Sequence, residues 1–324
     1  MSKLVVSSSP HISAPTSVRS IMLDVVLALL PAGCAAVWLF GINALLLILT
    51  CVISCVLSEY ICRKVMKRDT TIGDLSAVVT GLLLAYNLPP TLPLWMAAIG
   101  SIVAIVVAKQ LFGGIGQNFA NPAIIGRIVL MNSFATAMTT WAEPFFYKAQ
   151  DGSAADALSS ATVLVSQLKG EALPSITEML IGQRAGCLGE TCVIALLIGG
   201  IYLIARKVIN PFVPVVFIGT VALFTWINGD NVLYQVMSGG LILGAFFMAT
   251  DYSTTPTTFK GQLIFAFGCG AITSLIRIFG SLPEGVSYSI LIMNILTPLI
   301  DRITPTKPFG YSKPKKIKSG GEAE

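Results

Sequence analysis

The sequence predicts an all-α integral membrane protein, and three observations lead to that fold class. The chain of 324 residues is 54% hydrophobic and only 11% charged, whereas an ordinary soluble domain carries about 25% charged residues. Its mean hydropathy is +0.80. The apolar residues come in runs of roughly 20, the length that an α-helix needs to cross a hydrocarbon core. The short alternating segments of a membrane β-barrel do not occur.

The apolar runs predict about ten membrane-spanning helices. The third is short and ends at Asn87-Leu88-Pro89-Pro90, and the eighth runs into a polar stretch from Asp251 to Pro256. Each break combines proline with polar side chains, and the backbone groups freed there need internal partners in a bilayer. We therefore expect both helices to be interrupted or partly re-entrant. The expected spans are 21–40, 42–61, 75–89, 93–112, 122–141, 188–205, 212–228, 233–250, 261–280 and 286–303.

The positive charges predict the orientation of these helices, because cytoplasmic connections of membrane proteins are enriched in Lys and Arg. With the N-terminus inside, all of the 21 Lys and Arg residues fall on the cytoplasmic side except Lys148, Lys169, Arg184 and Arg277. A missed or extra helix would scramble this asymmetry. Both termini are expected in the cytoplasm, with the interval from about 142 to 187 outside, in a bacterial or archaeal cytoplasmic membrane.

The two halves of the chain resemble each other. The segment "GLLLAYNLPPTLP" from Gly81 is loosely matched by "GAFFMATDYSTTP" from Gly244, and "NPAIIGR" from Asn121 by "NILTPLIDR" from Asn294. Because five helices separate the copies, the second copy is inverted, and we expect two inverted five-helix repeats. The expected division is a cytoplasmic segment 1–20, a first repeat 21–141, an extracytoplasmic loop 142–187, a second repeat 188–303 and a basic cytoplasmic tail 304–324.

Composition argues against several classes of function. The formal net charge of +5 is not gathered in a basic stretch interleaved with aromatic residues, so nucleic-acid binding is not expected. No small-residue cleavage site follows a short apolar region near the N-terminus, so no removed signal peptide is expected. Cys51 and Cys55 share one helix face, but no CxxC or Cys/His set completes a four-ligand metal site. We interpret the seven cysteines as packing residues.

One small polar cluster stands alone in the longest polar interval. It is Ser159-Ser160-Ala161-Thr162, three residues after Asp156. Taken alone, it predicts a solvated loop or the N-cap of a short helix through "VLVSQLKG", because Ser and Thr satisfy free N–H groups at a helix start. A nucleophilic Ser or Thr enzyme is not expected, since the single histidine, His11, is predicted on the opposite side of the membrane and cannot serve as the base.

The segment Asp156-Ala157-Leu158-Ser159-Ser160-Ala161-Thr162 resembles the D-x-x-S-(G/S)-A-T flavinylation motif. That motif is found in one family of membrane proteins, which includes the D subunits of Rnf-type ion-translocating electron transport complexes and the B subunits of sodium-pumping NADH:quinone oxidoreductases. The similarity covers essentially the whole chain, including "GQNFANPAIIGR" from Gly116, "GCLGETCVIALLIGGIYLI" from Gly186 and the segment from Phe246 to Asp301. The lack of a long N-terminal extension favours the Rnf-type member of the family.

By this resemblance, Thr162 carries FMN through a phosphoester, and Asp156, Ser159, Ser160 and Ala161 are recognised by an extracytoplasmic flavin transferase that splits FAD. The topology derived from charge places Thr162 on the face where that enzyme works. The family implies a membrane component of a ferredoxin:NAD⁺ oxidoreductase that relays electrons and couples them to Na⁺ or H⁺ movement, with the A, B, C, E and G subunits as partners. The chain has no GxGxxG loop or cysteine cluster, so nicotinamide and iron–sulfur centres are expected in those partners.

Charged residues within or beside the spans are further candidate sites, because an unpaired charge in a bilayer is costly. Asp24 lies several residues inside the first helix, and we interpret it as a buried partner of another group or as an ion-path ligand. The related quinone-reductase subunit holds riboflavin, so this resemblance implies that one of the two breaks, at Asn87 or at Asp251, lines a pocket for a non-covalent riboflavin or FMN, or else an ion site. Asp251 is the preferred break because it supplies an ionisable residue with several hydroxyls. Arg127 is expected to act first as a snorkelling anchor near the inner end of the fifth helix and second as a site residue.

Two other classes of protein explain part of this pattern. A secondary transporter or channel accounts for ten helices, an inverted repeat and broken helices without any redox role. A scaffold protein of a complex needs no cofactor. The flavinylation motif and the full-length resemblance favour the redox protein, and flavin fluorescence that survives denaturation distinguishes it from both alternatives.

Overall fold

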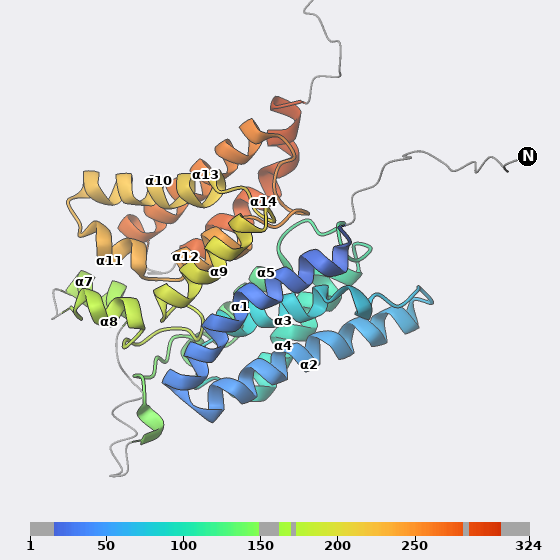
Figure 1. The fold of residues 1–324 in the computed structure, drawn as a ribbon, viewed down its shortest axis with the longest axis horizontal. Coiled ribbons are helices and arrows are strands. Elements are labelled where there is room, and N and C mark those ends of the chain that lie inside the picture. The colour runs from blue at the N-terminus through green and yellow to red at the C-terminus, as the bar shows by residue number, and fades with distance from the viewer. Residues whose placement is uncertain (1–15, 149–161, 170–172, 281–284, 306–324) are drawn as a thin grey trace, which may run out of the picture.

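A computed structural model of the chain describes residues 16–148, 162–169, 173–280 and 285–305, and within these ranges it contains helices and no β-strand (Figure 1). The first half comprises α1 Val18–Phe40, α2 Ile42–Val65, η1 Ile72–Asp74, α3 Ser76–Tyr86, α4 Leu94–Ile105, η2 Val106–Gln110, α5 Pro122–Ser133, α6 Ala135–Met138 and η3 Phe146–Lys148. Next come α7 Val163–Lys169 and α8 Ile176–Ile181. The second half comprises α9 Val193–Ala205, α10 Phe212–Asn228, α11 Val232–Met237, α12 Leu241–Leu243, η5 Gly244–Met248, α13 Phe259–Phe279 and α14 Val286–Ile303.

Among the described residues, four helices are long and apolar enough to cross a membrane: α1, α2, α13 and α14. Shorter apolar helices are α3, the continuous segment of α4 and η2, α5, α9 and α10. Each expected span overlaps one or more helical segments, and the all-helical fold class of a membrane protein is confirmed. Several of the spans are shorter or more broken than the apolar runs indicate.

In the third expected span, 75–89, the helix ends before the span does. α3 stops at Tyr86 because the Asn87 side-chain amide donates to the carbonyl of Leu83 at 2.7 Å and occupies the helix end. Pro89 and Pro90 follow, and neither has an N–H group to continue the helix. The fourth span continues from α4 as the π-helix η2, so its last turn is wider than an α-helical turn.

The eighth expected span, 233–250, is not one helix. α11 ends at Met237, and Gly239 and Gly240 both have φ of 66°, a conformation that residues with a side chain rarely adopt. The chain then restarts as α12 and the π-helix η5. Two other helices are shorter than expected. In the fifth span, 122–141, α5 ends at Ser133, and in the sixth span, 188–205, α9 begins only at Val193.

The helices pair in the same way in both halves. In the first half α2 packs against α4, and α4 packs against α5; in the second half α10 packs against α13, and α13 packs against α14. Two further pairs join the halves, α1 with α9 and α5 with α14. Figure 1 shows α1 to α5 as one group, α10, α13 and α14 as another, and α9 beside α1.

Glycine allows the closest helix contacts. A Cβ atom added to Gly81 in α3 would lie 2.8 Å from the Cα atom of Val52 in α2, and one added to Gly126 in α5 would lie 2.8 Å from the carbonyl oxygen of Gly100 in α4. Small residues at such crossings let backbones approach and gain van der Waals contact, which is the main source of helix association in lipid. These contacts hold the broken segments in place between the long helices.

Candidate functional site

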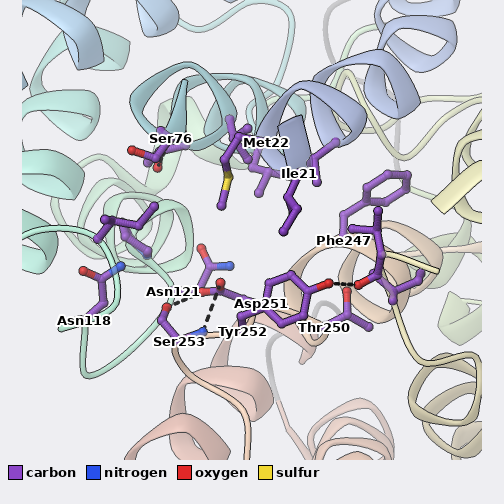
Figure 2. A pocket seen from close by; sticks show the side chains of 18 of the residues that line it. Ile21, Met22, Ser76, Asn118, Asn121, Phe247, Thr250, Asp251, Tyr252 and Ser253 are labelled. Atoms are coloured by element: carbon purple, nitrogen blue, oxygen red, sulfur yellow. Dashed lines mark hydrogen bonds between the residues drawn. The ribbon is translucent and has the colours of Figure 1, made fainter. Parts of the chain in front are cut away.

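A cavity lies at the second helix break, and we call it the Asp251 cavity (Figure 2). Its apolar wall includes Ile21 and Met22 from the start of α1 and Phe247 from η5. Its polar wall comes from four separate segments: Ser76 at the start of α3, Lys109 in η2, Asn118 and Asn121 before α5, and the stretch from Thr250 to Ser253 after η5. Both halves of the chain therefore contribute to one cavity, with apolar and polar groups on different sides.

The break at Asp251 is a hydrogen-bonded turn. The Asp251 carboxylate accepts from the Ser253 hydroxyl at 3.0 Å and the Thr254 hydroxyl at 3.2 Å. The Thr255 hydroxyl donates to the Asp251 carbonyl oxygen at 2.7 Å, and the Tyr252 hydroxyl donates to the carbonyl oxygen of Val208 before α10. Ser, Thr and Asp side chains thus satisfy the backbone groups that leave the helix, as a membrane-embedded break requires.

Two asparagines face Asp251 from the segment before α5. Asn121 caps α5 by accepting from the Ala123 N–H group at 3.0 Å, and its side-chain amide donates to the Met248 carbonyl oxygen at 3.5 Å. The side-chain carbonyl oxygen of Asn118 is buried and has no hydrogen-bond partner among the described residues. A buried acceptor without a partner is costly. Asn118 and Asp251 together make this end of the cavity rich in acceptors.

A fully buried ion pair closes one edge of the Asp251 cavity. The Lys109 ammonium group donates to the Glu59 carboxylate at 2.8 Å and to the Ser76 hydroxyl at 2.6 Å. The second carboxylate oxygen of Glu59 accepts from the Thr71 hydroxyl at 2.6 Å and from the Gln110 amide at 3.0 Å. The charges of this cluster therefore balance, and it fixes the start of α3 to α2 and η2.

Thr162 lies directly before α7, which covers Val163–Lys169. The Ser166 N–H group donates to the Thr162 carbonyl oxygen at 2.9 Å, as expected for the start of a short helix. The side chain is only 5% exposed, and its hydroxyl has no hydrogen-bond partner among the described residues. Of the two readings left by the sequence, the start of a short helix agrees with this place, whereas a solvated loop does not, because the side chain is buried. Asp156, Ser159, Ser160 and Ala161 lie outside the described residues.

A small pocket, the Thr162 pocket, adjoins this side chain and is lined by Thr162, Arg184, Glu190, Ser238 and Gly239 among others. A larger cavity of about 460 Å³, the loop cavity, lies beside it. The walls of the loop cavity include Pro144, Phe145, Pro174 and Gln183, together with the acidic residues Glu143 and Glu178. Val163, Arg184 and Ala185 line both spaces. The two spaces therefore adjoin at Arg184.

Two buried arginines surround the Thr162 pocket. Arg184 donates to the carbonyl oxygens of Glu190 at 2.6 Å and Met237 at 2.5 Å, and to the Ser238 hydroxyl at 3.4 Å. Arg277 donates to the carbonyl oxygens of Gln235 at 2.6 Å and Ser238 at 3.0 Å. Neither forms an ion pair within the described part of the chain. These bonds fix the turn at which α11 gives way to α12.

Arg127 does not act as a snorkelling anchor. It is 2% exposed and donates to the Asn87 side-chain oxygen at 2.7 Å, the Ser287 hydroxyl at 3.1 Å and the Cys187 sulfur at 3.8 Å. It therefore joins the end of α3, α5, α14 and the segment before α9 in the interior. The snorkelling interpretation is wrong because α3 ends so early that polar groups gather around Arg127.

Asp24 has partners on α9. Its carboxylate accepts from the Tyr202 hydroxyl at 2.9 Å and lies 3.3 Å from an Arg206 guanidinium nitrogen. It is not among the residues that line the Asp251 cavity. Of the two alternatives left by the sequence, the geometry corresponds to a partner of another group.

Sequence reasoning missed Arg184, Glu190 and Asn118 as members of the two sites. Arg184 and Glu190 stand in "GQRAGCLGETC", a charged interruption between apolar runs, and that contrast is the feature with which to find them. Nothing in the sequence indicates that Arg277, far along the chain, lies beside them. Cys51 and Cys55 of α2 are buried as expected, whereas Cys62 of the same helix is partly exposed and Cys34 of α1 is exposed. The described residues contain no group of His, Cys, Asp and Glu side chains that could hold a metal ion.

The chain was compared with known proteins. The model of the NQR2, RnfD, RnfE family matches residues 5–310. The chain is 46% identical over 318 residues to the D subunit of the Na⁺-translocating ferredoxin:NAD⁺ oxidoreductase complex of Acetobacterium woodii, covering 97% of each chain. It is 48% identical to the D subunit of the proton-translocating ferredoxin:NAD⁺ oxidoreductase complex of Clostridium ljungdahlii, covering 94% of this chain and 96% of that one.

A further relative, the D subunit of the ion-translocating oxidoreductase complex of Halorhodospira halophila, is 36% identical over 351 aligned positions, again with 97% of each chain covered. The similarity thus extends along the whole sequence and includes the segments that form both cavities. The chain belongs to the NQR2, RnfD, RnfE family, within which its similarity is to the D subunits of Rnf-type complexes.

Proposed function

We propose that this chain is the flavin-carrying membrane component of an ion-translocating ferredoxin:NAD⁺ oxidoreductase complex of the Rnf type. It relays electrons through FMN bound covalently to Thr162 and couples them to Na⁺ or H⁺ movement. The relatives named as D subunits of such complexes support the assignment to the complex. The observation that supports the flavin is the Thr162 hydroxyl, which ends the motif, is buried without a hydrogen-bond partner among the described residues, and adjoins a cavity.

The residues around Thr162 suit a flavin. The loop cavity, with about 460 Å³, offers apolar contacts from Pro144, Phe145 and Pro174, and its polar groups are Glu143, Ser166, Glu178, Gln183 and Arg184. Ligand sites of this kind typically measure about 300–1,000 Å³ and combine apolar walls with a few polar groups. When bound there, FMN supplies one- and two-electron transfer. Thr162 and the cavity walls hold it in place and limit its contact with water.

Attachment of FMN to Thr162 requires a flavin transferase acting from outside. The Thr162 Oγ–P bond forms, the pyrophosphate bond of FAD breaks, and AMP and the hydroxyl proton leave. Because the Thr162 side chain is 5% exposed, the segment has to reach the transferase before it packs. The transferase then recognises Asp156, Ser159, Ser160 and Ala161.

The Asp251 cavity is a second candidate site, for a non-covalent riboflavin or FMN, or for the coupling ion. The Asn118 side-chain oxygen, buried without a partner among the described residues, and the Asp251 carboxylate provide acceptors for the ring N–H and the ribityl hydroxyls of a flavin. Met22, Ile21 and Phe247 provide apolar contacts for the ring system (Figure 2). The same carboxylate, with the nearby Ser and Thr oxygens, also suits a cation.

The arrangement in the membrane is proposed to consist of ten crossings in two inverted five-helix repeats. Both termini lie in the cytoplasm, and Thr162 lies outside. The A, B, C, E and G subunits carry the iron–sulfur and nicotinamide chemistry. The matched pairings of α2 with α4 and of α10 with α13 support the repeat. Overall similarity does not decide the coupling ion, because relatives named for Na⁺ and for protons are 46% and 48% identical to this chain.

Replacement of Thr162 by Ala tests the flavin assignment. The Thr162→Ala protein, produced together with a flavin transferase, should lose all covalent flavin, because no hydroxyl remains to form the ester. In-gel flavin fluorescence after denaturation and mass spectrometry of the peptide spanning 149–169 measure the loss. Thr177→Ala, at an exposed threonine of α8, is the matched control and should retain flavin. Covalent flavin in the Thr162→Ala protein contradicts the assignment, and its absence from the wild-type protein favours a transporter or a scaffold.

A further inference from the structure

A buried arginine in the last turn of α2 uses none of its side-chain donors within the described part of the chain. Arg63 is 9% exposed, and its guanidinium group forms neither a hydrogen bond nor an ion pair with any described residue. Its Nε atom is closed off from solvent, whereas the two terminal nitrogens are not. A largely buried cation without a partner is costly. Arg63 therefore offers donors to an acceptor from outside the described chain.

The carboxylates of α2 and of the elements packed against it are already bonded elsewhere. Glu59, one turn before Arg63, is paired with Lys109; Asp24 of α1 is paired with Arg206; and Asp74 of η1 accepts from the Ser76 hydroxyl. Asp69, in the connection after α2, is exposed and follows three exposed basic residues, Lys64, Lys67 and Arg68. The helix dipole favours a cation in the last turn, but it does not satisfy the N–H donors of that cation. The surroundings of Arg63 therefore favour an anion.

The loop after η2 approaches Arg63 at a glycine. Gly114 has a φ of +107°, and a Cβ atom added there would collide with a terminal nitrogen of Arg63. Glycine therefore brings the loop close without covering the guanidinium group with side-chain atoms. The unpartnered side-chain oxygen of Gln110 would lie 3.9 Å from the same Cβ atom. It is a neutral acceptor and fully buried, so it neither balances the charge of Arg63 nor meets a ligand at the surface.

The exposed apolar side of α2 leads to this end of the helix. Large exposed side chains recur every three or four residues along it: Leu46, Leu49, Ile53, Leu57 and Ile61. Because α2 is long and apolar enough to cross a membrane, this stripe suits contact with acyl chains. It ends at Lys64, whose ammonium group lies 5.8 Å from the centre of the Tyr60 ring. Tyrosine with a basic residue at a helix end is typical of the lipid–water interface, so Arg63 lies at the depth of lipid headgroups.

We propose that Arg63 binds the phosphate group of an anionic phospholipid whose acyl chains lie along the apolar stripe of α2. The planar guanidinium group suits phosphate oxygens, and the basic residues after it favour a lipid with net negative charge over a zwitterionic one. The lipid joins the end of α2 to the loop after η2. Because η2 carries Lys109, this contact also supports one edge of the Asp251 cavity. The proposal does not depend on the flavin at Thr162.

The first test compares two lipids on the wild-type protein. The full chain, purified in detergent, is titrated with phosphatidylglycerol or with phosphatidylethanolamine of the same acyl chains, and bound lipid is counted by native mass spectrometry. The first phosphatidylglycerol should bind about tenfold more tightly, as expected for one additional interaction with a charged group. Equal affinity for the two lipids overturns the proposal. Displacement of phosphatidylglycerol by inorganic phosphate at equal concentration shows a site for a free anion and contradicts the assignment to a lipid.

Variants of Arg63 locate the site. Arg63→Gln should lose the preference for phosphatidylglycerol and keep the affinity for phosphatidylethanolamine, because only the charge that attracts the anionic lipid is removed. The matched control, Arg302→Gln at an exposed arginine of α14, should keep the preference. Arg63→Lys, which retains the charge without the planar fork, should keep a part of it. A wild-type preference in the Arg63→Gln protein overturns the role of Arg63.

Thermal unfolding of the delipidated proteins separates lipid binding from a structural role of Arg63. The side chain has no bond to another described residue to lose, so Arg63→Gln without lipid should unfold at the wild-type temperature or above it. Phosphatidylglycerol should raise the unfolding temperature of the wild-type protein and leave that of Arg63→Gln unchanged. A less stable Arg63→Gln protein with the full lipid-dependent shift shows a structural arginine and contradicts the proposal. If the variant does not fold, the comparison of the two lipids on the wild-type protein still decides.

Discussion

The two cavities of this chain differ in their charge, and the difference indicates what each can hold. At the Asp251 cavity the buried Lys109 is paired with Glu59, and the remaining polar groups are mostly acceptors from Asn118 and Asp251. At the Thr162 pocket Arg184 and Glu190 line the wall, and Arg277 lies beside Gly239 at its edge. A balanced, acceptor-rich cavity favours a neutral ligand with donor groups or a cation. An arginine whose donors already bond to protein acceptors, as those of Arg184 do, instead holds the chain itself in place.

The comparison also shows two ways of fixing a broken helix with a buried cation. Lys109 donates to the Ser76 hydroxyl at the start of α3, and Arg277 donates to the Ser238 carbonyl oxygen just before α12. Lys109 belongs to the segment that continues α4, and Arg277 lies near the end of α13, so the two cations occupy matching places in the two halves. The first is neutralised by a carboxylate on α2, whereas the second has no ion-pair partner among the described residues.

The largest effect is expected from breaking the balanced pair. Glu59→Gln leaves the Lys109 ammonium group buried without its counter-charge, and removal of one partner from a buried pair typically costs about 3–5 kcal/mol. Thermal unfolding in detergent should show a marked loss of stability. The double variant Glu59→Gln, Lys109→Met removes both charges and should recover much of that loss. A double variant no more stable than Glu59→Gln would contradict the pairing account.

A loss of similar size, partly offset, is expected at the second buried cation. Arg277→Met removes charged hydrogen bonds to the carbonyl oxygens of Gln235 and Ser238, and bonds of this kind each contribute about 1.5–3 kcal/mol. The loss is partly offset because the substitution also removes a buried charge that has no ion-pair partner among the described residues. Chemical denaturation of the protein without flavin measures it. A loss larger than that of Glu59→Gln would contradict the offset.

Asp251→Ala tests whether the Asp251 cavity and the Thr162 pocket have separate functions. The substitution removes an acceptor and the turn bonds to Ser253 and Thr254, so electron transfer or ion coupling by the assembled complex should fall by about tenfold, equivalent to about 1.4 kcal/mol. The covalent flavin on Thr162 should remain, since the two sites do not share residues. Activity and flavin content in membranes carrying the complex are the measurements, and unchanged activity leaves the Asp251 turn with a structural role alone.

The smallest effect is expected at Asp24. Arg206, its ion-pair partner, is 57% exposed at the side chain, and ion pairs that reach solvent contribute less than about 1 kcal/mol. Asp24→Asn keeps an acceptor for the Tyr202 hydroxyl and should change the unfolding temperature by no more than a degree or two. A loss of ion transport with unchanged stability would restore Asp24 as an ion-path ligand.

The sequence alone determines the kind of fold and the place of the breaks. Long apolar runs with few charges require helices, because in lipid every backbone N–H and C=O group needs a partner within its own segment. Asn87 with Pro89 and Pro90, and Asp251 with the Ser and Thr residues after it, mark the interruptions for the same local reason. The N-cap position of Thr162 before α7 also follows from local residue preferences. These features depend on neighbours along the chain.

Tertiary structure decided which polar groups meet. Arg127 is read as an anchor from its position near a helix end, yet the early end of α3 brings Asn87, Cys187 and Ser287 to it. Thr162 is read as a loop residue, yet packing against Arg184 and Gly239 buries it. Charge balance around a site depends on contacts between residues far apart in sequence, such as Arg184 with Met237 or Lys109 with Glu59. Those contacts form only when helices that are distant in sequence pack together, within one half for Lys109 with Glu59 and between the halves for Arg127 with Ser287.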